Sequence, residues 1–206
     1  IALLLTRSKL AKILGTISLF LTFSSGAIGA LLIVVLLMRI KKEKIFRSVA
    51  LAIFWITVVV SLALPVISKE AVLRVRENNE SVFKRLTLAE TAGRIITANP
   101  LFGAGQNNFI TEKLKSESGP TTVWWLQPVH NIFLLVFAET GIVGLLVFVL
   151  ILYAGLAKTL VRGKVFALAL LFIVLTGAAD HYWLTLQQNQ LLVAMVLGLS
   201  FRKARE

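Results

Sequence analysis

Long uninterrupted apolar runs are the feature that most restricts how this chain can fold. The clearest are residues 49–68, 141–157 and 165–185, and a shorter run at 191–201 begins near Gln187. A helix needs about 20 apolar residues to cross the hydrocarbon of a bilayer. Of the 206 residues, 57% are hydrophobic and only 16% are charged, whereas a soluble domain carries about 25% charged residues. We therefore predict an all-α integral membrane protein, a helical bundle with several spans.

Basic residues gather at the ends of these runs and predict the orientation of the chain. Lys and Arg close to a span are retained on the cytoplasmic side. This rule makes residues 49–68 run outward, places residues 69–129 outside the cytoplasm, and makes the later spans alternate. The net charge of +12 therefore indicates topology, and we expect no nucleic acid partner. The clusters are Arg39, Lys41, Lys42, Lys44 and Arg47; Lys158, Arg162 and Lys164; and Arg202, Lys203 and Arg205.

The stretch from residue 8 to 38 has two interpretations. Its length favours one long tilted helix over residues 13–38, while the basic residues that precede it favour a hairpin that turns outside at Ser24, Ser25 and Gly26. We favour the hairpin. The chain starts inside an apolar run without Met, so we expect further residues before it. The predicted parts are transmembrane helices at 1–68, an extracytoplasmic loop at 69–129, and a short interfacial helix with three transmembrane helices at 130–206.

The outer loop is the one polar region of the sequence, and we expect it to be ordered. Apolar residues recur at helical spacing and predict an amphipathic helix over 82–97, which Asn99 and Pro100 end. Gly103 and Gly105 predict a tight loop, and residues 118–120 a further turn. Trp124 and Trp125 suit a membrane interface. The residues on the apolar face of the predicted helix are Val82, Leu86, Ala89, Ala92, Gly93 and Ile96.

The residue types that are missing exclude several kinds of chemistry. The chain has no cysteine, and Asp180 is its single aspartate, so an aspartate pair that holds a metal diphosphate cannot form. A phosphate-binding loop of the G-x-x-x-x-G-K-[ST] type is also missing, which leaves ATP hydrolysis unsupported. We therefore expect no metal and no other cofactor. Arg or Lys would have to neutralise a leaving phosphate.

Two histidines and two arginines are candidates for chemistry on the outer side. His130 stands where the outer loop enters an apolar helix, and a His of near-neutral pKa can act as a general base toward a hydroxyl. Helix capping is the alternative role for His130. Arg85 and Arg94 lie nine residues apart on the predicted helix and face roughly opposite directions, so a solvated helix face is the alternative for either.

Three further ionisable residues lie close to predicted helix ends. Glu139 precedes a predicted span, and its alternative role is structural, since the helix dipole stabilises a carboxylate at a helix start. Asp180 and His181 lie together at the outer end of the run 165–185. They are candidates for function because ionisable residues near membrane depth are costly, and a structural hydrogen-bonded pair is the alternative.

Two segments of the sequence resemble a known family. Residues 99–105 read Asn-Pro-Leu-Phe-Gly-Ala-Gly, followed by Asn108-Phe109; residues 130–131 read His-Asn, and residues 138–142 read Ala-Glu-Thr-Gly-Ile. In this order and between spans they resemble the "hPlfGvGpgnF" and "HN…AEtGi.Gll" segments of the O-antigen ligase/polymerase superfamily. Arg85-Leu86 stands where that family places an Arg-Leu pair. The resemblance extends over about residues 22–160.

The resemblance implies a fold of the GT-C type and a metal-free glycosyltransferase in the bacterial cytoplasmic (inner) membrane. Such an enzyme takes a glycan from undecaprenyl diphosphate on the extracytoplasmic face and passes it to a hydroxyl acceptor. The acceptor is the lipid A core in ligases of lipopolysaccharide biosynthesis, a growing chain in polymerases, and a protein in related oligosaccharyltransferases.

The resemblance also implies roles for single residues. Arg85, with Arg94 in support, would contact the diphosphate. His130 would activate the acceptor hydroxyl, and Asn131 would support it. Gly103 and Gly105 would shape the loop over the site, and Asn108 and Glu139 lie in the matching segments; Asp180 and His181, outside the resemblance, stay candidates for support of the site.

Two departures from the family pattern keep other functions open. Ser25 stands where the family often has an arginine, and Ala89 stands where it often has a tryptophan. They motivate the alternative of a degenerate membrane scaffold. A non-catalytic glycan or lipid transporter is a further alternative, but the runs 49–68 and 141–157 lack the central charges expected of one.

Overall fold

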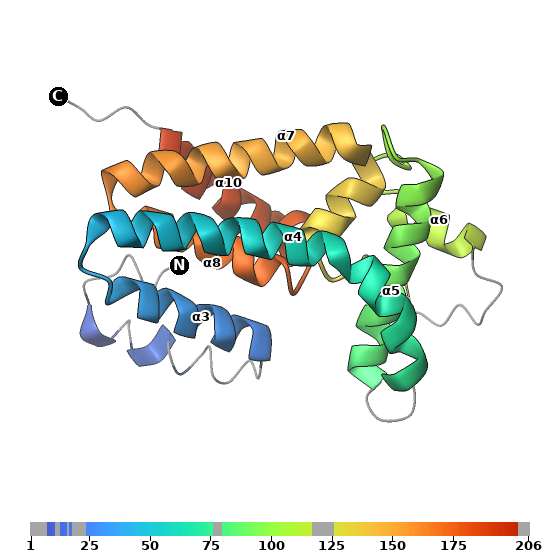
Figure 1. The fold of residues 1–206 in the computed structure, drawn as a ribbon, viewed down its shortest axis with the longest axis horizontal. Helices are drawn as coiled ribbons and strands as arrows, with labels where there is room; N and C mark the ends of the chain where they lie inside the picture. The colour runs from blue at the N-terminus through green and yellow to red at the C-terminus, as the bar shows by residue number, and fades with distance from the viewer. Residues whose placement is uncertain are drawn as a thin grey trace. The chain divides into compact units, whose positions relative to one another are not determined.

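The computed structural model describes residues 8–10, 13–15, 17, 24–75, 80–116 and 126–201. Within these ranges the chain is helical and contains no strand, as Figure 1 shows. The predicted all-α class is therefore confirmed for the described residues. Trp124, Trp125 and the predicted turn at 118–120 lie outside them.

The chain divides into two compact units. The first comprises Ile1–Ile56, Ile151–Thr176 and Leu186–Glu206, and the second comprises Thr57–Leu150 and Gly177–Thr185. Helices α4 (Glu43–Val75) and α7 (Ile132–Arg162) each contribute to both units.

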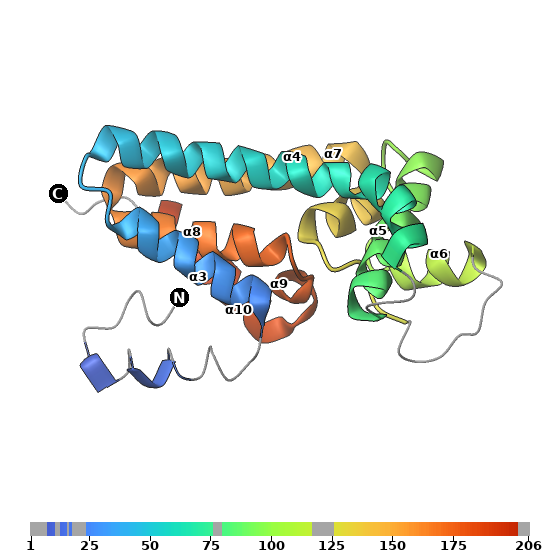
Figure 2. The same ribbon diagram turned by 60° about the horizontal axis from the view of Figure 1, so that its bottom comes forward.

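The first unit packs helices α3 (Ser25–Met38), α8 (Lys164–Gly177) and α10 (Gln187–Phe201) with parts of α4 and α7. Within it, the early part of α4 and the late part of α7 run side by side in Figures 1 and 2. The rings of Phe54 and Trp55 contact Tyr153 there, with centroids 6.2 and 5.8 Å apart. Gly155 lets Leu170 and Leu197 approach α7 closely.

The start of α3 bears on the two interpretations of residues 8–38. Ser24 is extended, with φ −81° and ψ 99°, and its hydroxyl accepts a hydrogen bond from the backbone N–H of Ala27. Ser24 therefore caps α3, and a single helix over 13–38 does not form because the helix is interrupted here. The hairpin stays a prediction, since residues 18–23 lie outside the described ranges.

Among the described residues, two helices are long and apolar enough to cross a membrane: Glu43–Ser68 and Ile132–Val161. Only 22% and 33% of their most apolar windows are buried within the protein. Two further apolar helices, α3 and α8, are shorter. A large exposed apolar surface on long helices is expected where lipid covers it.

The single span predicted over 165–185 is wrong. Helix α8 ends at Gly177, the chain turns through residues 178–181, and a short helix α9 (Tyr182–Thr185) follows. The carbonyls of Ala178 and Ala179 accept hydrogen bonds from distant side chains instead of from a continuing helix. The last predicted apolar run lies in the helix α10, which begins at Gln187; whether it spans the membrane stays a prediction.

The second unit contains α5 (Glu80–Ala98), α6 (Phe109–Ser116), the end of α4 and the start of α7. The predicted amphipathic helix is present as α5, and Pro65 of α4 packs so closely on α5 that a Cβ at Gly93 would lie 2.8 Å from its Cβ. The part of α4 that could cross a membrane ends at Ser68, the predicted end of that span, and the helix itself continues to Val75. The core residues of this unit are Leu88, Ala89, Ala92, Ile95, Phe109, Val129, Leu134, Leu135 and Ala138.

The buried face of α5 differs in part from the predicted one. Ala89 and Ala92 are buried as expected, but Val82 is 41% exposed, while Leu88 and Ile95 are buried. The first turns of α5 extend past the core, so apolar periodicity there does not correspond to burial.

Candidate functional site

A loop after α5 closes onto a kink in α7. Gly141 lies within α7 with φ 68° and ψ −170°, a conformation that glycine alone adopts readily. The kink leaves backbone groups on both sides of it without hydrogen-bond partners in the helix itself. The loop pairs with them through four bonds: Ala104 N–H to Ala138 O (2.9 Å), Gly105 N–H to Glu139 O (2.9 Å), Ile142 N–H to Pro100 O (2.9 Å) and Val143 N–H to Leu101 O (3.4 Å).

Glycine is required at the closest approach of these two segments. Gly103 and Gly105 have φ of 69° and 97°. A Cβ on Gly103 would overlap the backbone of Glu139 and Thr140, and one on Gly141 would overlap the backbone of Leu101 and Phe102. The segments 99–105 and 138–142 noted in the sequence therefore pack against each other as one structure. Their glycines allow the close backbone contact at the kink.

Glu139 and Asn108 belong to this same structure. Glu139 Oε1 accepts a hydrogen bond from the backbone N–H of Phe109 at 3.4 Å and the carboxylate also accepts one from the N–H of Asn107, so it caps the start of α6. Asn108 donates from its side-chain amide to the carbonyl of Ala104 at 3.1 Å. Both side chains therefore stabilise the loop.

Asn131 is buried and joins α7 to the segment after α8. Its Oδ1 accepts hydrogen bonds from the N–H groups of Phe133 (2.9 Å) and Leu134 (3.1 Å), which makes it the N-cap of α7. Its Nδ2 donates to the carbonyl of Ala178 at 3.0 Å. Asn131 has 1% of its surface exposed, and its hydrogen bonds connect the start of α7 to this segment.

The segment 178–185 packs against His130. The guanidinium of Arg85 donates to the carbonyl of Ala179 at 3.2 Å, which joins α5 to this segment. The His130 and His181 rings lie with centroids 5.2 Å apart. Nδ1 of His181 is 2.8 Å from the hydroxyl of Thr185, and the N–H of His181 donates to Asp180 Oδ1 at 2.7 Å.

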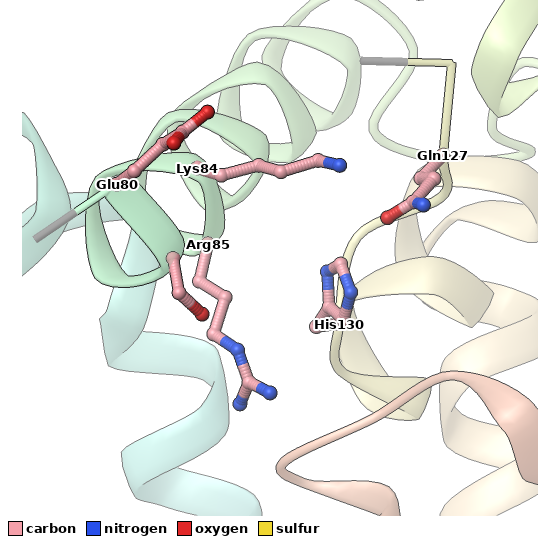
Figure 3. Close-up of a pocket in the computed structure, with 6 residues that line it drawn as sticks. Glu80, Lys84, Arg85, Gln127 and His130 are labelled. Atoms are coloured by element: carbon pink, nitrogen blue, oxygen red, sulfur yellow. The ribbon is translucent and has the colours of Figure 1, made fainter. Parts of the chain in front are cut away.

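Two adjoining pockets share Arg85 and His130. A polar pocket of about 300 Å³ lies between α5 and the residues before α7. Figure 3 shows the side chains of Lys84 and Arg85 reaching from α5 toward the side where Gln127 and His130 lie. An apolar pocket of about 230 Å³ is the second. The polar pocket is lined by Glu80, Ser81, Lys84, Arg85, Gln127 and His130, and the apolar one by Leu64, Val82, Arg85, Leu86, Ala89, Val129, His130, Asn131, Leu134, Ala178 and Ala179.

Both imidazoles favour the neutral form. Burial lowers the pKa of His130 from 6.5 to about 4; the Asp180 carboxylate opposes this shift, and His181, Arg85 and Lys84 add to it. Burial also lowers the pKa of His181, again against Asp180. At neutral pH His130 therefore keeps a ring nitrogen able to accept a proton.

The spacing of residues along the chain did not predict a metal site, but the fold brings three possible ligands together. One atom each of His130, Asp180 and His181 lies within 4.8 Å of the others. Among the described residues, none forms a hydrogen bond with the buried Nδ1 of His130. The donor set of two imidazoles and a carboxylate would suit a divalent transition metal.

The predicted site residues fall into two groups. Arg85, His130 and Asn131 line the pockets, Asp180 and His181 lie beside His130, and Gly103, Gly105, Asn108 and Glu139 lie at the kink in α7. Arg94 lines neither pocket; it is exposed, and its guanidinium donates to the hydroxyl of Thr91 at 3.2 Å. Sequence reasoning missed Lys84, which adjoins Arg85 in sequence, and Gln127, which carried no signal.

Comparison with known proteins identifies a family. Residues 10–149 match a family model described as O-antigen ligase. No curated protein matches the chain, and no solved structure does. The matched range includes Arg85 and His130 but ends before Asp180 and His181.

Proposed function

The chain belongs to the O-antigen ligase family, and we propose that it transfers a glycan from a lipid-linked diphosphate to a hydroxyl acceptor. The observation that carries this proposal is the pair Arg85 and His130, which border one polar and one apolar pocket in common. A lipid-linked diphosphate presents an anionic group between a polar sugar and an apolar chain. The two adjoining pockets match that division.

In the proposed reaction, His130 acts as the general base. A neutral imidazole accepts the proton of the acceptor hydroxyl as its oxygen attacks the anomeric carbon of the donor sugar. The bond from that carbon to the diphosphate oxygen breaks, and the lipid diphosphate leaves with the electron pair. One glycosidic bond forms as one glycosyl–phosphate bond breaks, and no metal takes part in the proposed reaction.

Arg85 and Lys84 would supply the positive charge that the leaving diphosphate requires. Charge-assisted hydrogen bonds to phosphate oxygens are about twice as strong as neutral ones. These same cations help lower the pKa of His130. A bound diphosphate would offset their charge and raise that pKa, so the base would become stronger when the donor is in place.

We place this chemistry on the extracytoplasmic face of the bacterial inner membrane, with undecaprenyl diphosphate as the lipid. The basic clusters at the ends of the apolar runs and the family membership support this proposal. The acceptor is a lipid core, a growing glycan or a protein hydroxyl, and ligase activity on a lipid core is the form that the family description favours.

The test is a transfer assay on the whole protein reconstituted in liposomes with a lipid-linked glycan and each of the three acceptor classes. Glycosylated acceptor and free lipid diphosphate should appear together. Replacing His130 by Ala should lower the rate by about 10²–10⁴-fold, and Arg85→Ala by about 10²–10³-fold. Arg94→Ala is the matched control on the same helix and should retain near wild-type transfer.

Three outcomes would contradict the proposal. Wild-type transfer by both pocket variants would remove the assigned roles. Movement of lipid-linked glycan across the bilayer without release of free lipid diphosphate would indicate a transporter, and neither activity in the wild-type protein would indicate a scaffold.

A further inference from the structure

Two large apolar side chains lie exposed on the loop that closes against the kink in α7. Leu101 is 60% exposed and Phe102 is 75% exposed. The other end of the same loop is polar, with Gln106 and Asn107 also exposed. A loop with one apolar and one polar end has the amphipathic character of an interfacial segment.

An exposed apolar stripe begins on α7 next to this loop. Val143, Leu146, Val147 and Leu150 are 47%, 55%, 53% and 60% exposed. Their spacing of i, i+3, i+4 and i+7 places them on one face of the helix. This face belongs to one of the two helices that could cross a membrane, so lipid is its expected cover.

The loop and the stripe are joined by hydrogen bonds at the kink. The N–H of Val143, the first residue of the stripe, donates to the carbonyl of Leu101 at 3.4 Å, and the N–H of Ile142 donates to that of Pro100 at 2.9 Å. The apolar surface therefore continues from α7 onto Leu101 and Phe102.

Several backbone groups of the loop are paired within the protein, which favours contact with lipid. Irregular backbone is excluded from the hydrocarbon because its polar groups lose their hydrogen bonds to water. Here the N–H groups of Gly103, Ala104 and Gly105 donate to carbonyls of Asn99, Ala138 and Glu139, and the carbonyls of Pro100 and Leu101 are also paired. These hydrogen bonds lower the cost of moving this part of the loop out of water.

We infer that Leu101 and Phe102 insert into the nearer leaflet of the bilayer and fix the depth of the kinked start of α7. The partner is a phospholipid surface at the boundary of headgroups and acyl chains. Apolar faces of interfacial segments lie about 5–10 Å into this boundary. The inference depends on membrane association and not on the proposed transfer reaction.

The absence of cysteine from the sequence allows a direct test with single spin labels. Phe102→Cys, Leu146→Cys and Gln106→Cys variants of the whole chain are labelled with a nitroxide and reconstituted in phosphatidylcholine liposomes. Leu146 is the lipid-facing reference, and Gln106 is the aqueous reference in the same loop. All three positions are exposed in the protein, so the labels should not disturb folding.

Collision rates with molecular oxygen, which concentrates in acyl chains, and with a water-soluble nickel chelate report the depth of each label. The label at 102 should resemble that at 146, with a nickel collision rate several-fold below that at 106. A nickel collision rate at 102 equal to that at 106 would overturn the inference. So would a label at 146 in water, or strong spin–spin broadening at 102 without oxygen contact, which would indicate a second copy as the partner.

Discussion

The side-chain amide of Asn131 donates a hydrogen bond of 3.0 Å to the backbone carbonyl of Ala178, 47 residues further along the chain. The same side chain caps α7. One buried residue therefore fixes both the start of the helix that follows His130 and the segment that carries Asp180 and His181.

Asn131→Asp should separate these two functions. Aspartate keeps the capping oxygen but loses the amide donor to Ala178, whereas Asn131→Ala loses both. We expect Ala to cost about 1–3 kcal/mol for the unsatisfied buried group and about 1 kcal/mol more for the lost cap. Thermal unfolding in detergent should place both variants below the wild type. An Ala variant as stable as the wild type would show that the side-chain hydrogen bonds of Asn131 contribute nothing to stability.

Gly141→Ala should unfold at a lower temperature than the wild type. A residue other than glycine at φ 68° and ψ −170° costs about 1–3 kcal/mol in backbone strain, and its Cβ would also overlap the backbone of Leu101 and Phe102. Gly198→Ala in α10 is the matched control, because nothing lies within 4 Å of its added Cβ. The control should be neutral or stabilised by about 0.4–1 kcal/mol. Equal effects of the two substitutions would rule out the proposed role of the kink.

The stability of the protein should depend on pH through His130. Its pKa is about 4 in the folded protein and 6.5 as a free side chain, so the unfolded chain binds more protons between these values. Stability should therefore fall as the pH drops from about 6.5 to about 4. The unfolding temperature of His130→Gln should decline less over this window. Part of the decline in unfolding temperature should remain in this variant, because the pKa of His181 is also lowered.

The acid limb of the transfer rate should move with the charges around His130. Transfer requires the neutral imidazole and should decline as the pH falls toward the pKa of the free enzyme. The Asp180 carboxylate raises that pKa, so Asp180→Asn should shift the acid limb of kcat/KM to lower pH. A shift to higher pH, or none, would argue against His130 as the titrating base.

Lys84→Gln should weaken donor binding more than it slows the chemical step. Lys84 lines the polar pocket beside Arg85, and loss of one cation near a diphosphate should raise KM for the lipid-linked donor about tenfold. The effect should decrease with added salt. Lys115→Gln is the control, since that ammonium pairs with Glu112 at 2.7 Å and lines neither pocket. Equal KM changes in both variants would indicate a general charge effect.

A chelator should leave transfer unchanged if Arg85 and Lys84 neutralise the diphosphate. The close approach of His130, Asp180 and His181 makes this a real test. Protein dialysed against EDTA should retain its full rate. Loss of transfer with recovery on added Zn²⁺ or Mn²⁺, but not in His181→Ala, would instead place a required cation at these three residues.

Local signals in the sequence determined the helical elements and the class of protein. The apolar runs predicted the helices that became α4, α7 and α10, and the periodicity of residues 82–97 predicted α5. Hydropathy and helical spacing act over a few turns, so they can be read without knowledge of the fold. The family resemblance, and not local spacing, predicted that Arg85 and His130 belong to one site. The pockets that both residues line are consistent with that prediction.

The tertiary structure alone decided where the apolar run 165–185 breaks and what that break provides. Hydropathy does not record the loss of helical hydrogen bonds at Ala178 and Ala179, because Asn131 and Arg85 supply the replacement donors from far along the chain. The same long-range contacts bring Asp180 and His181 to His130. The interlock of Gly103 with Gly141 likewise depends on steric overlap between two distant backbones, which no local pattern contains.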